Sequence, residues 1–419
     1  MKEQQPIVHK KRNLTIGSAF RTGVSVGLGI SFSSNFAQNH PEFMRDLNRA
    51  LTNGYGDKDK AQTIVVPNPV FPTFVPTIEI VSTAQAIEPT EVAQIVPHIE
   101  WLSENKTEYG FNTHLRGDAQ SGQNLDLTHF KHNVDLLKNA GQTWIRFDMR
   151  EDQIIKMSSP TVINWNEHNL QTYDEAIEYA RKQGLKIFIP VGIPNGITSG
   201  MTQTELEIFA HHFYGGLAGR YAGKVAVWQI ANEADVHDFR SYDKIMREMP
   251  QDYLNAFAGV VQNGSDGIHQ ADPNALVTVN MSWWFGSGRN LESEGQRLFG
   301  AVVNSIDIIT FDFYPDTSTA NISKMPKIVA DFSQKFGKPV IVGELGLPTA
   351  SFSVKDQGHY MGLSVGALKG GLVTPRAVLM YELTDEANIS GNEGSFGFLQ
   401  TDGTPKPSWQ QILPWLQEN

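Results

Sequence analysis

The chain of 419 residues contains no cysteine. Disulfide bonds, thiolate metal sites and cysteine nucleophiles are therefore excluded, although the redox compartment stays undecided. The chain also lacks an excess of positive charge, because 34 Lys and Arg stand against 45 Asp and Glu, for a net charge of -11. A protein that binds a phosphate backbone needs a basic face, so nucleic acid is not an expected partner.

An apolar run long enough to span a bilayer is missing from the N-terminal region. The most apolar stretch of this region, residues 24–32, is too short to cross a membrane. Lys10, Lys11 and Arg12 precede it, and this order resembles a secretory signal. We interpret residues 1–38 either as a signal or anchor segment or as a disordered tail. The first interpretation predicts an extracellular or membrane-anchored protein that associates with the cell envelope, and the second allows a cytoplasmic one.

Proline is concentrated in one segment. Residues 62–98 carry prolines at positions 67, 69, 72, 76, 89 and 97. This spacing excludes a helix and disfavours a central strand. We therefore expect residues 39–105 to form a Pro-rich linker and residues 106–419 to form the folded domain. Hydrophobic residues at 40% and charged residues at 19% are typical of a globular protein.

The region after Lys106 alternates regularly between strand-like and helix-like patterns. Helical spacing is clearest in residues 129–141, 173–184, 206–223 and 253–272. The strand-like segments are apolar nearly throughout, as expected for parallel strands buried on both faces. They cover residues 109–115, 143–149, 186–192, 225–233, 276–284, 307–315, 339–347 and 377–385.

Eight such units in roughly 300 residues predict an α/β fold, a (β/α)8 TIM barrel preceded by a largely irregular N-terminal segment. The competing fold is an open doubly wound sheet. That fold normally has a Gly-rich phosphate turn after its first strand, and "FNTHLRGDAQ" is not such a turn.

Chemistry in a TIM barrel takes place at the carboxyl ends of the strands. Glu233 ends the fourth predicted strand and Glu344 lies on the seventh, so we expect that the two carboxyl groups can face each other across the barrel mouth. Two carboxyl groups that flank a cleft are what the cleavage of a glycosidic bond requires. A Schiff-base aldolase would need a lysine at a strand end, and none of the eight predicted ends carries one.

Polar and aromatic residues mark the other strand ends. Trp283 and Trp284 are adjacent and point to opposite sides of one strand. We expect Trp283 to line the cleft and Trp284 to pack in the core. The candidate substrate-binding residues are Asn232, Arg146, Tyr314, Trp283, Tyr381 and His114.

Five segments resemble clan A of the glycoside hydrolases, the 4/7 superfamily, over about residues 106–419. They are "WQIANEA", "VIVGELGLPT", "WIRFDM", "FDFYPD" and "GSFGFLQTDGTPKPSW". Three departures leave family 5, family 39 and neighbouring families open. Asp312 stands where family 5 usually has histidine, Tyr381 where many members have tryptophan, and Ala234 where proline is commoner.

The resemblance implies a retaining double displacement that cleaves β-glycosidic bonds. Glu344 would be the nucleophile and Glu233 the acid/base. Asn232 would bind the 2-hydroxyl group of the sugar, while Arg146 and Tyr314 would hold the nucleophile. His114, Trp283 and Tyr381 would line the subsite.

The expected substrate is an oligosaccharide or polysaccharide, and no cofactor or metal is expected. Two alternatives stay open, a catalytically weak carbohydrate-binding barrel and a transglycosylase. The oligomeric state, the sugar and the choice between endo and exo action are not predicted.

Overall fold

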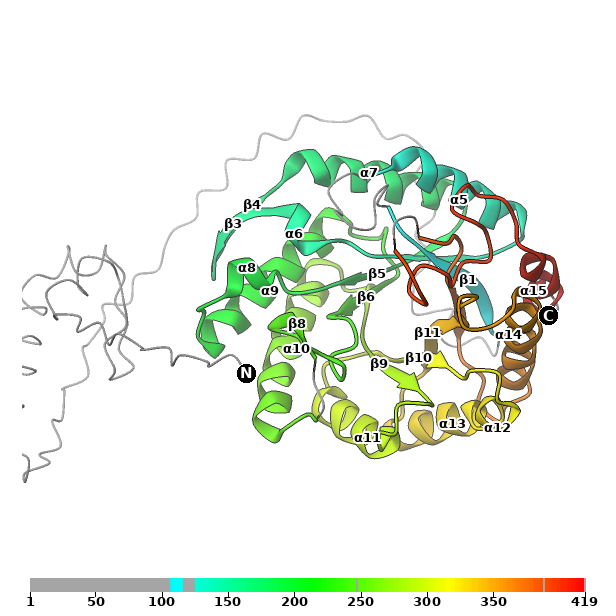
Figure 1. The fold of residues 1–419 in the computed structure, drawn as a ribbon. Helices are drawn as coiled ribbons and strands as arrows, with labels where there is room; N and C mark the ends of the chain where they lie inside the picture. Colours follow the sequence, from blue (N-terminus) through cyan, green and yellow to red (C-terminus); the bar gives the residue numbers. More distant parts are fainter. Residues whose placement is uncertain (1–105, 116–124, 246–247, 387–388, 418–419) are drawn as a thin grey trace, which may run out of the picture. The chain divides into compact units, whose positions relative to one another are not determined.

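The computed structural model describes residues 106–115, 125–245, 248–386 and 389–417. Within these residues, eight parallel strands close into a barrel in the order β1-β12-β11-β10-β9-β6-β5-β2. Helices form a ring around the barrel (Figure 1). The predicted (β/α)8 fold is confirmed. The expectations for residues 1–38 and 39–105 lie outside the described residues and stay predictions.

Each of the eight predicted segments overlaps one barrel strand. Two short hairpins, β3–β4 and β7–β8, were not predicted. The barrel strands are β1 Glu108–Thr113, β2 Trp144–Phe147, β5 Lys186–Val191, β6 Val227–Ile230, β9 Leu276–Trp284, β10 Ile308–Tyr314, β11 Val340–Gly346 and β12 Ala377–Tyr381. The hairpin strands are β3 Ile155–Ser159, β4 Val162–Trp165, β7 His237–Asp238 and β8 Ser241–Ile245.

Local signals set the ends of several helices. The side chain of Asp126 accepts a hydrogen bond from the first turn of α5, and Thr202 and Glu205 form a capping box at α9. Gly337 ends α13 in a left-handed conformation with φ 65°. The longer helices are α5 Leu127–Asn139, α7 Glu167–Lys182, α9 Gln203–Arg220, α10 Gln251–Ala271, α11 Leu291–Val302, α13 Met325–Phe336, α14 Val354–Lys369 and α15 Pro407–Gln417. The short ones are α6 Glu151–Ile154, α8 Asn195–Thr198 and α12 Thr319–Ile322.

The two faces of each strand pack differently. One set of side chains joins the large apolar core with the helices. The other set points into the barrel, because successive side chains of a strand alternate between its two faces. A small apolar cluster packs there, made of Trp144, Phe188, Ala226, Val227, Leu276, Ile308, Ile341, Ala377 and Leu379. Along the same inward face, polar residues follow toward the carboxyl ends of the strands, and they position the site.

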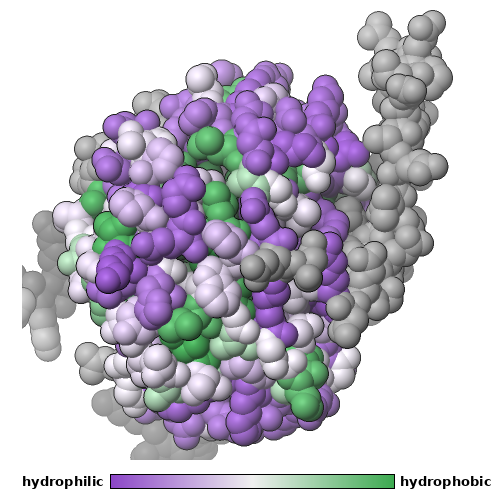
Figure 2. Space-filling view, turned by 90° about the vertical axis from the view of Figure 1, so that its right-hand side faces the viewer, coloured by the Kyte–Doolittle hydropathy of each residue, from purple (hydrophilic) through white to green (hydrophobic). Residues whose placement is uncertain are grey.

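The outer surface is mixed in character. On the face that carries α14 and α15, hydrophobic residues lie in separate small groups among hydrophilic ones (Figure 2). Among the described residues, no helix combines the length and apolar character needed to cross a membrane.

Candidate active site

A bulge in strand β11 sets the direction of Glu344. Phe311 of β10 pairs with Val342, but the next residue, Asp312, pairs with Glu344, so Gly343 is an extra residue in β11. A Cβ atom at Gly343 would lie only 2.6 Å from the side chain of Thr310. Glycine is therefore required here, and the bulge turns the Glu344 side chain toward the barrel mouth.

Both oxygens of Glu344 accept hydrogen bonds. Arg146 Nη1 donates to Oε1 at 2.6 Å, and the hydroxyl of Tyr314 donates to Oε2. Burial and the charge of Glu344 raise the pKa of Tyr314 well above its ordinary value, so this phenol keeps its proton. The two donors therefore hold a buried carboxyl group, only 6% exposed, in one orientation.

Arg146 donates hydrogen bonds to several residues of the site besides Glu344. Its guanidinium also donates to Asn112 Oδ1 at 2.5 Å, to Gln229 Oε1 at 3.1 Å and to Asn232 Oδ1 at 3.2 Å. Burial by itself lowers the pKa of Arg146, but the charges of Glu344 and Asp312 raise it above its ordinary value. Arg146 is therefore a fully buried cation that binds side chains from strands β1, β6 and β11 and from the loop after β6.

Asn280 of strand β9 holds the residues that follow β6. Its Oδ1 accepts the backbone N–H of Glu233 at 2.8 Å, so its Nδ2 is the amide donor. That nitrogen donates to Asn232 Oδ1 at 3.0 Å and to a carboxyl oxygen of Asp312. Gln229 Nε2 also donates to Asn232 Oδ1, at 2.9 Å. Asn232 Oδ1 therefore accepts three hydrogen bonds, from Arg146, Gln229 and Asn280. The amide nitrogen of Asn232 is left as the donor toward the cavity.

Glu233 has an unusual backbone. Its φ is 44°, and that of Ala231 is 61°, values in the left-handed region that residues with a side chain rarely adopt. The backbone carbonyl of Glu233 accepts from Val236 N–H at 2.8 Å and from His237 N–H at 2.9 Å. This tight turn lets the chain leave β6 abruptly and places the Glu233 side chain over the barrel mouth.

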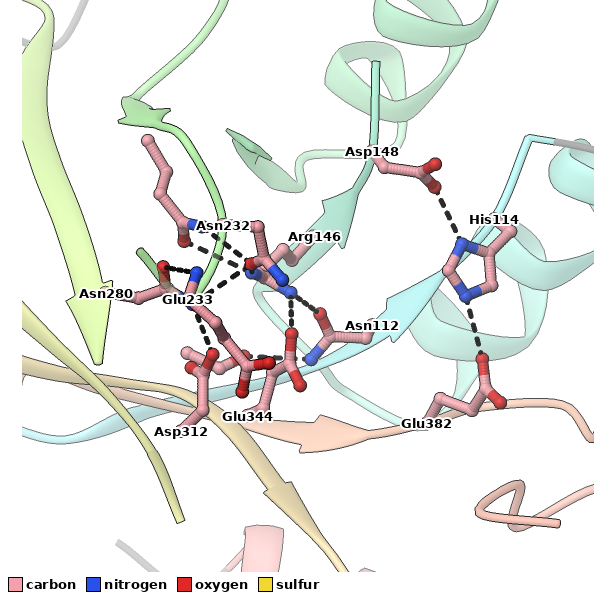
Figure 3. A network of polar contacts seen from close by, with 12 residues as sticks. Asn112, His114, Arg146, Asp148, Asn232, Glu233, Asn280, Asp312, Glu344 and Glu382 are labelled. Carbon is pink, nitrogen blue, oxygen red and sulfur yellow. Dashed lines mark hydrogen bonds and ion pairs between the residues drawn. The ribbon is translucent and has the colours of Figure 1, made fainter. Parts of the chain in front are cut away.

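The carboxyl groups of Glu233 and Glu344 project into the same space (Figure 3). Burial, and then the charges of Glu344 and Asp235, raise the pKa of Glu233 from 4.5 to about 8, while a hydrogen bond from Ser282 opposes the shift. Burial beside like charges therefore favours the protonated form of Glu233. The site can offer one carboxyl group as a proton donor while the other accepts hydrogen bonds from a cation and a phenol.

A cavity of about 700 Å³ is bordered by Glu344 and by Asn232, the residue before Glu233. Its volume is typical of small-molecule sites. It extends from the barrel centre toward the carboxyl ends of β1, β2 and β5. Its lining includes Asn112, His114, Arg146, Asp148, Glu151, Asn232, Glu344 and Tyr381.

His114 lines the cavity, and Figure 3 shows its ring between the carboxyl groups of Asp148 and Glu382. Its Nδ1 is 2.7 Å from Asp148 Oδ1, and its Nε2 is 3.0 Å from Glu382 and 3.4 Å from Glu386. His114, Glu382 and Glu386 offer atoms within 4.8 Å of one another, close enough to hold a cation. The expectation of no metal and no cofactor stays a prediction.

Most residues predicted for the site meet there. Asn232, Arg146 and Tyr314 join the network around the two glutamates, and His114 and Tyr381 line the cavity.

The prediction for Trp283 is wrong. Trp283 is only 5% exposed and packs against Phe311, Phe313 and Phe332 in the outer core, whereas Trp284 is 56% exposed. The reason is the phase of the strand, since the residues that point outward from β9 are the odd-numbered ones.

Several polar residues of the site were not predicted. They are Asn112, Gln229 and Asn280, and Asp312 was noted only as a departure from the usual family 5 pattern. A signal for Asn280 was present, because Thr278, Asn280 and Ser282 alternate with apolar residues in "LVTVNMSWW". Polar residues with a period of two on a buried strand indicate that one face lines a polar interior.

Comparison with known proteins decides the family. The model of the cellulase family (glycosyl hydrolase family 5) matches residues 103–367. The chain belongs to glycosyl hydrolase family 5. The resemblance predicted from the motifs is thereby confirmed, and this family 5 chain is a glycoside hydrolase with a carbohydrate substrate. No curated protein sequence matches the chain.

Solved structures share the fold at low identity. A GH5_18 protein from Streptomyces cattleya, in complex with GlcNAc, is 13% identical with a TM-score of 0.59, over 76% of this chain and 82% of the other. A family 39 glycoside hydrolase from Bacteroides cellulosilyticus is 18% identical with a TM-score of 0.55, over 74% and 64%. A β-glucosidase from Pyrococcus furiosus is 12% identical with a TM-score of 0.57, over 74% and 95%.

Proposed function

We propose that this family 5 chain hydrolyses β-glycosidic O-linkages by a retaining double displacement. Glu344 is the nucleophile and Glu233 is the acid/base. The observation that carries the proposal is the contrast between the two carboxyl groups. Glu344 accepts hydrogen bonds from Arg146 and Tyr314, which stabilise a negative charge, whereas Glu233 has a raised pKa.

In the first step, Glu344 attacks the anomeric carbon while Glu233 gives its proton to the leaving oxygen. The bond from carbon to the leaving oxygen breaks, and an ester to Glu344 forms. The amide nitrogen of Asn232, which its three neighbours direct to the cavity, donates to the 2-hydroxyl group of the sugar. This hydrogen bond strengthens as positive charge develops on the ring.

In the second step, Glu233 acts as a base. The ester removes the negative charge of Glu344, which is one of the causes that raise the pKa of Glu233. That pKa therefore falls in the intermediate, and Glu233 takes a proton from water as the water attacks the anomeric carbon. The bond from the anomeric carbon to Glu344 breaks, the sugar leaves with its original β configuration, and both carboxyl groups return to their starting states.

The first experiment is a panel of aryl β-glycosides, with the first-formed product followed by NMR. The panel starts with β-glucoside, β-mannoside and β-N-acetylglucosaminide, because a neighbouring structure holds Manβ1-4GlcNAc. We expect the β-anomer of the free sugar to appear first and the α-anomer to grow in later. An α-anomer formed first would contradict retention. A wild type that binds a glycan and cleaves nothing would favour the carbohydrate-binding alternative.

The raised pKa of Glu233 predicts a pH profile. For a substrate with a poor leaving group, kcat/KM should fall about tenfold for each pH unit above a pKa of about 8, because the proton donor is lost. Glu233→Ala, measured on a glycoside with a dinitrophenolate leaving group that needs no proton, should lack this alkaline limb. If the variant keeps the limb, another group carries the titration and the assignment of Glu233 as the acid is wrong.

The N-terminal region adds a separate proposal about location. Its basic residues and short apolar core support export or attachment to the cell envelope. Fractionation of cells that express the full chain would test this, and recovery of the whole protein in the cytoplasm would contradict it.

A further inference from the structure

The loop after β6 holds a second buried carboxyl group close to Glu233. Asp235 is only 1% exposed. Its Oδ1 accepts the backbone N–H of Ser282 at 3.0 Å, and its Oδ2 lies 2.9 Å from Arg289 Nη2. A buried carboxylate is costly unless it is paired with a cation and hydrogen-bonded, and Asp235 has both kinds of partner. The two catalytic steps described above leave this group without a task.

Arg289 joins the loop after β6 to the start of helix α11. Besides the carboxyl group of Asp235, its Nη2 donates to the backbone carbonyl of Asp235 at 3.1 Å. Its Nε donates to Oε2 of Glu294, in the first turn of α11, at 2.8 Å. Burial raises the pKa of Asp235 from 3.8 to about 6, and the charge of Arg289 opposes that shift. Arg289 therefore favours the ionised form of Asp235.

Ser282 of strand β9 connects Asp235 to Glu233. Asp235 binds its backbone N–H, while its side chain hydrogen-bonds to the carboxyl group of Glu233. Asn280, two residues earlier on the same face of β9, accepts the backbone N–H of Glu233. The strand therefore contacts the turn at Glu233 and again at Asp235. Such support is needed, because a φ of 44° at Glu233 is a costly backbone conformation that its surroundings must hold.

We propose that Asp235 is a positioning residue for the acid/base, which fixes Ser282 against the carboxyl group of Glu233 and, with Arg289, sets how strongly Glu233 holds its proton. This inference rests on the proposed function, in which Glu233 is the proton donor. Asp235 binds no sugar in this role and acts only on Glu233, through its charge and through Ser282.

Asp235 and Ser282 act on Glu233 in opposite directions. Burial is the largest cause of the raised pKa of Glu233, and the charges of Glu344 and Asp235 follow, whereas the hydrogen bond from Ser282 lowers that pKa. The other charged or titratable groups that interact with Glu233 are Arg146 on β2 and Asp312 and Tyr314 on β10. The opposite signs separate an electrostatic role from a loss of packing.

The alkaline limb of kcat/KM on a substrate with a poor leaving group reports the proton of Glu233. Asp235→Asn keeps the size of the side chain and an oxygen for the N–H of Ser282, but it removes the charge and leaves the cation of Arg289 less compensated. Both changes favour ionised Glu233, so the limb should move to lower pH by roughly one pH unit. Ser282→Ala keeps the backbone N–H and loses only the hydroxyl group, so the limb should move to higher pH.

Asp174→Asn is the matched control. It removes the same charge from the outer helix α7, where Asp174 pairs with Arg220 at 2.7 Å and is 39% exposed, and it should leave the limb in place. An equal shift in this control would overturn the proposal, because net charge alone would then explain the result. A limb that Asp235→Asn leaves in place or moves to higher pH would overturn it as well. Ser282→Ala tests the contact independently, and an unmoved limb or a shift to lower pH contradicts it.

A wild type that cleaves no glycoside would instead refute the proposed function. The carboxyl group of Glu233 can then be titrated directly by ¹³C NMR, in protein labelled at the glutamate side chains and with the signal assigned by Glu233→Gln. Opposite shifts of this titration in Asp235→Asn and Ser282→Ala support the role of Asp235. A titration that neither variant moves, or that both move in the same direction, overturns it.

Discussion

Glu344→Ala is expected to lower kcat on an aryl β-glycoside by on the order of 10⁵-fold, within the range seen when an enzyme loses its nucleophile. The variant has no group that can form the glycosyl ester. Added azide fills the space left by the carboxyl group and attacks from the same side as Glu344 did. The product should therefore be the α-glycosyl azide, whose configuration is inverted, and NMR of the product is the measurement.

Glu233→Ala provides the matched comparison for this experiment. In that variant the ester to Glu344 still forms on an activated substrate, so azide should attack the ester and return the β-glycosyl azide. Glu344→Gln keeps the size of the side chain and controls for the loss of packing. Azide products of the same anomeric configuration from the two alanine variants would contradict the assigned roles. Activity that survives both substitutions would show that the reaction takes place elsewhere.

Arg146→Ala is expected to lower the free energy of unfolding by about 3–5 kcal/mol, since it breaks a buried ion pair by removing one partner. Arg146 is only 4% exposed, and its loss leaves the carboxyl group of Glu344 without a cation. The oxygens of Asn112 and Gln229 lose a donor as well. Urea unfolding of wild type and variant measures the difference. Activity should fall too, because the orientation of Asn232 and Glu344 depends on the same guanidinium.

Arg220→Ala is the control for burial. Arg220 pairs with Asp174 at 2.7 Å and with Glu167 at 2.9 Å, but its side chain is 28% exposed. Exposed ion pairs contribute roughly 0–1 kcal/mol, so this variant should unfold almost like the wild type. A similar loss of free energy of unfolding in the two arginine variants would contradict the explanation that burial makes the Arg146 ion pair more important for stability. Arg146→Lys should recover part of the stability but little activity, because lysine lacks the planar fork that reaches several acceptors.

The strand pattern was predictable because of how a barrel buries its strands. Both faces of a parallel strand are covered, so each strand is a short apolar segment that stands out between helical patterns. The two glutamates were predictable for the same reason, since a carboxyl group at the end of such a segment has no role in packing. The phase of β9 was harder to predict. Trp283 and Trp284 are both apolar, and only the polar alternation of Asn280 and Ser282 indicates which of the two faces inward.

The partners within the site were not predictable, because they join distant parts of the chain. Arg146 and Glu344 are 198 residues apart, and Asn280 and Glu233 are 47 residues apart. Nothing local in "NMSWW" indicates that Asn280 binds the backbone of another strand end. Neither the left-handed backbone of Glu233 nor the bulge at Gly343 has a signal in the neighbouring residues, since both depend on contacts across the barrel.

The sequence by itself determined the barrel, the resemblance to clan A and the two carboxyl groups at the barrel mouth, because these follow from short-range hydrophobic periodicity and from residue types at strand ends. Only the tertiary structure decided how differently the two carboxyl groups are surrounded. That difference arises from the burial of Glu233 beside a like charge and from the cation and phenol that hold Glu344. Desolvation and charge interactions act through space, so they exist only once the eight strands have closed.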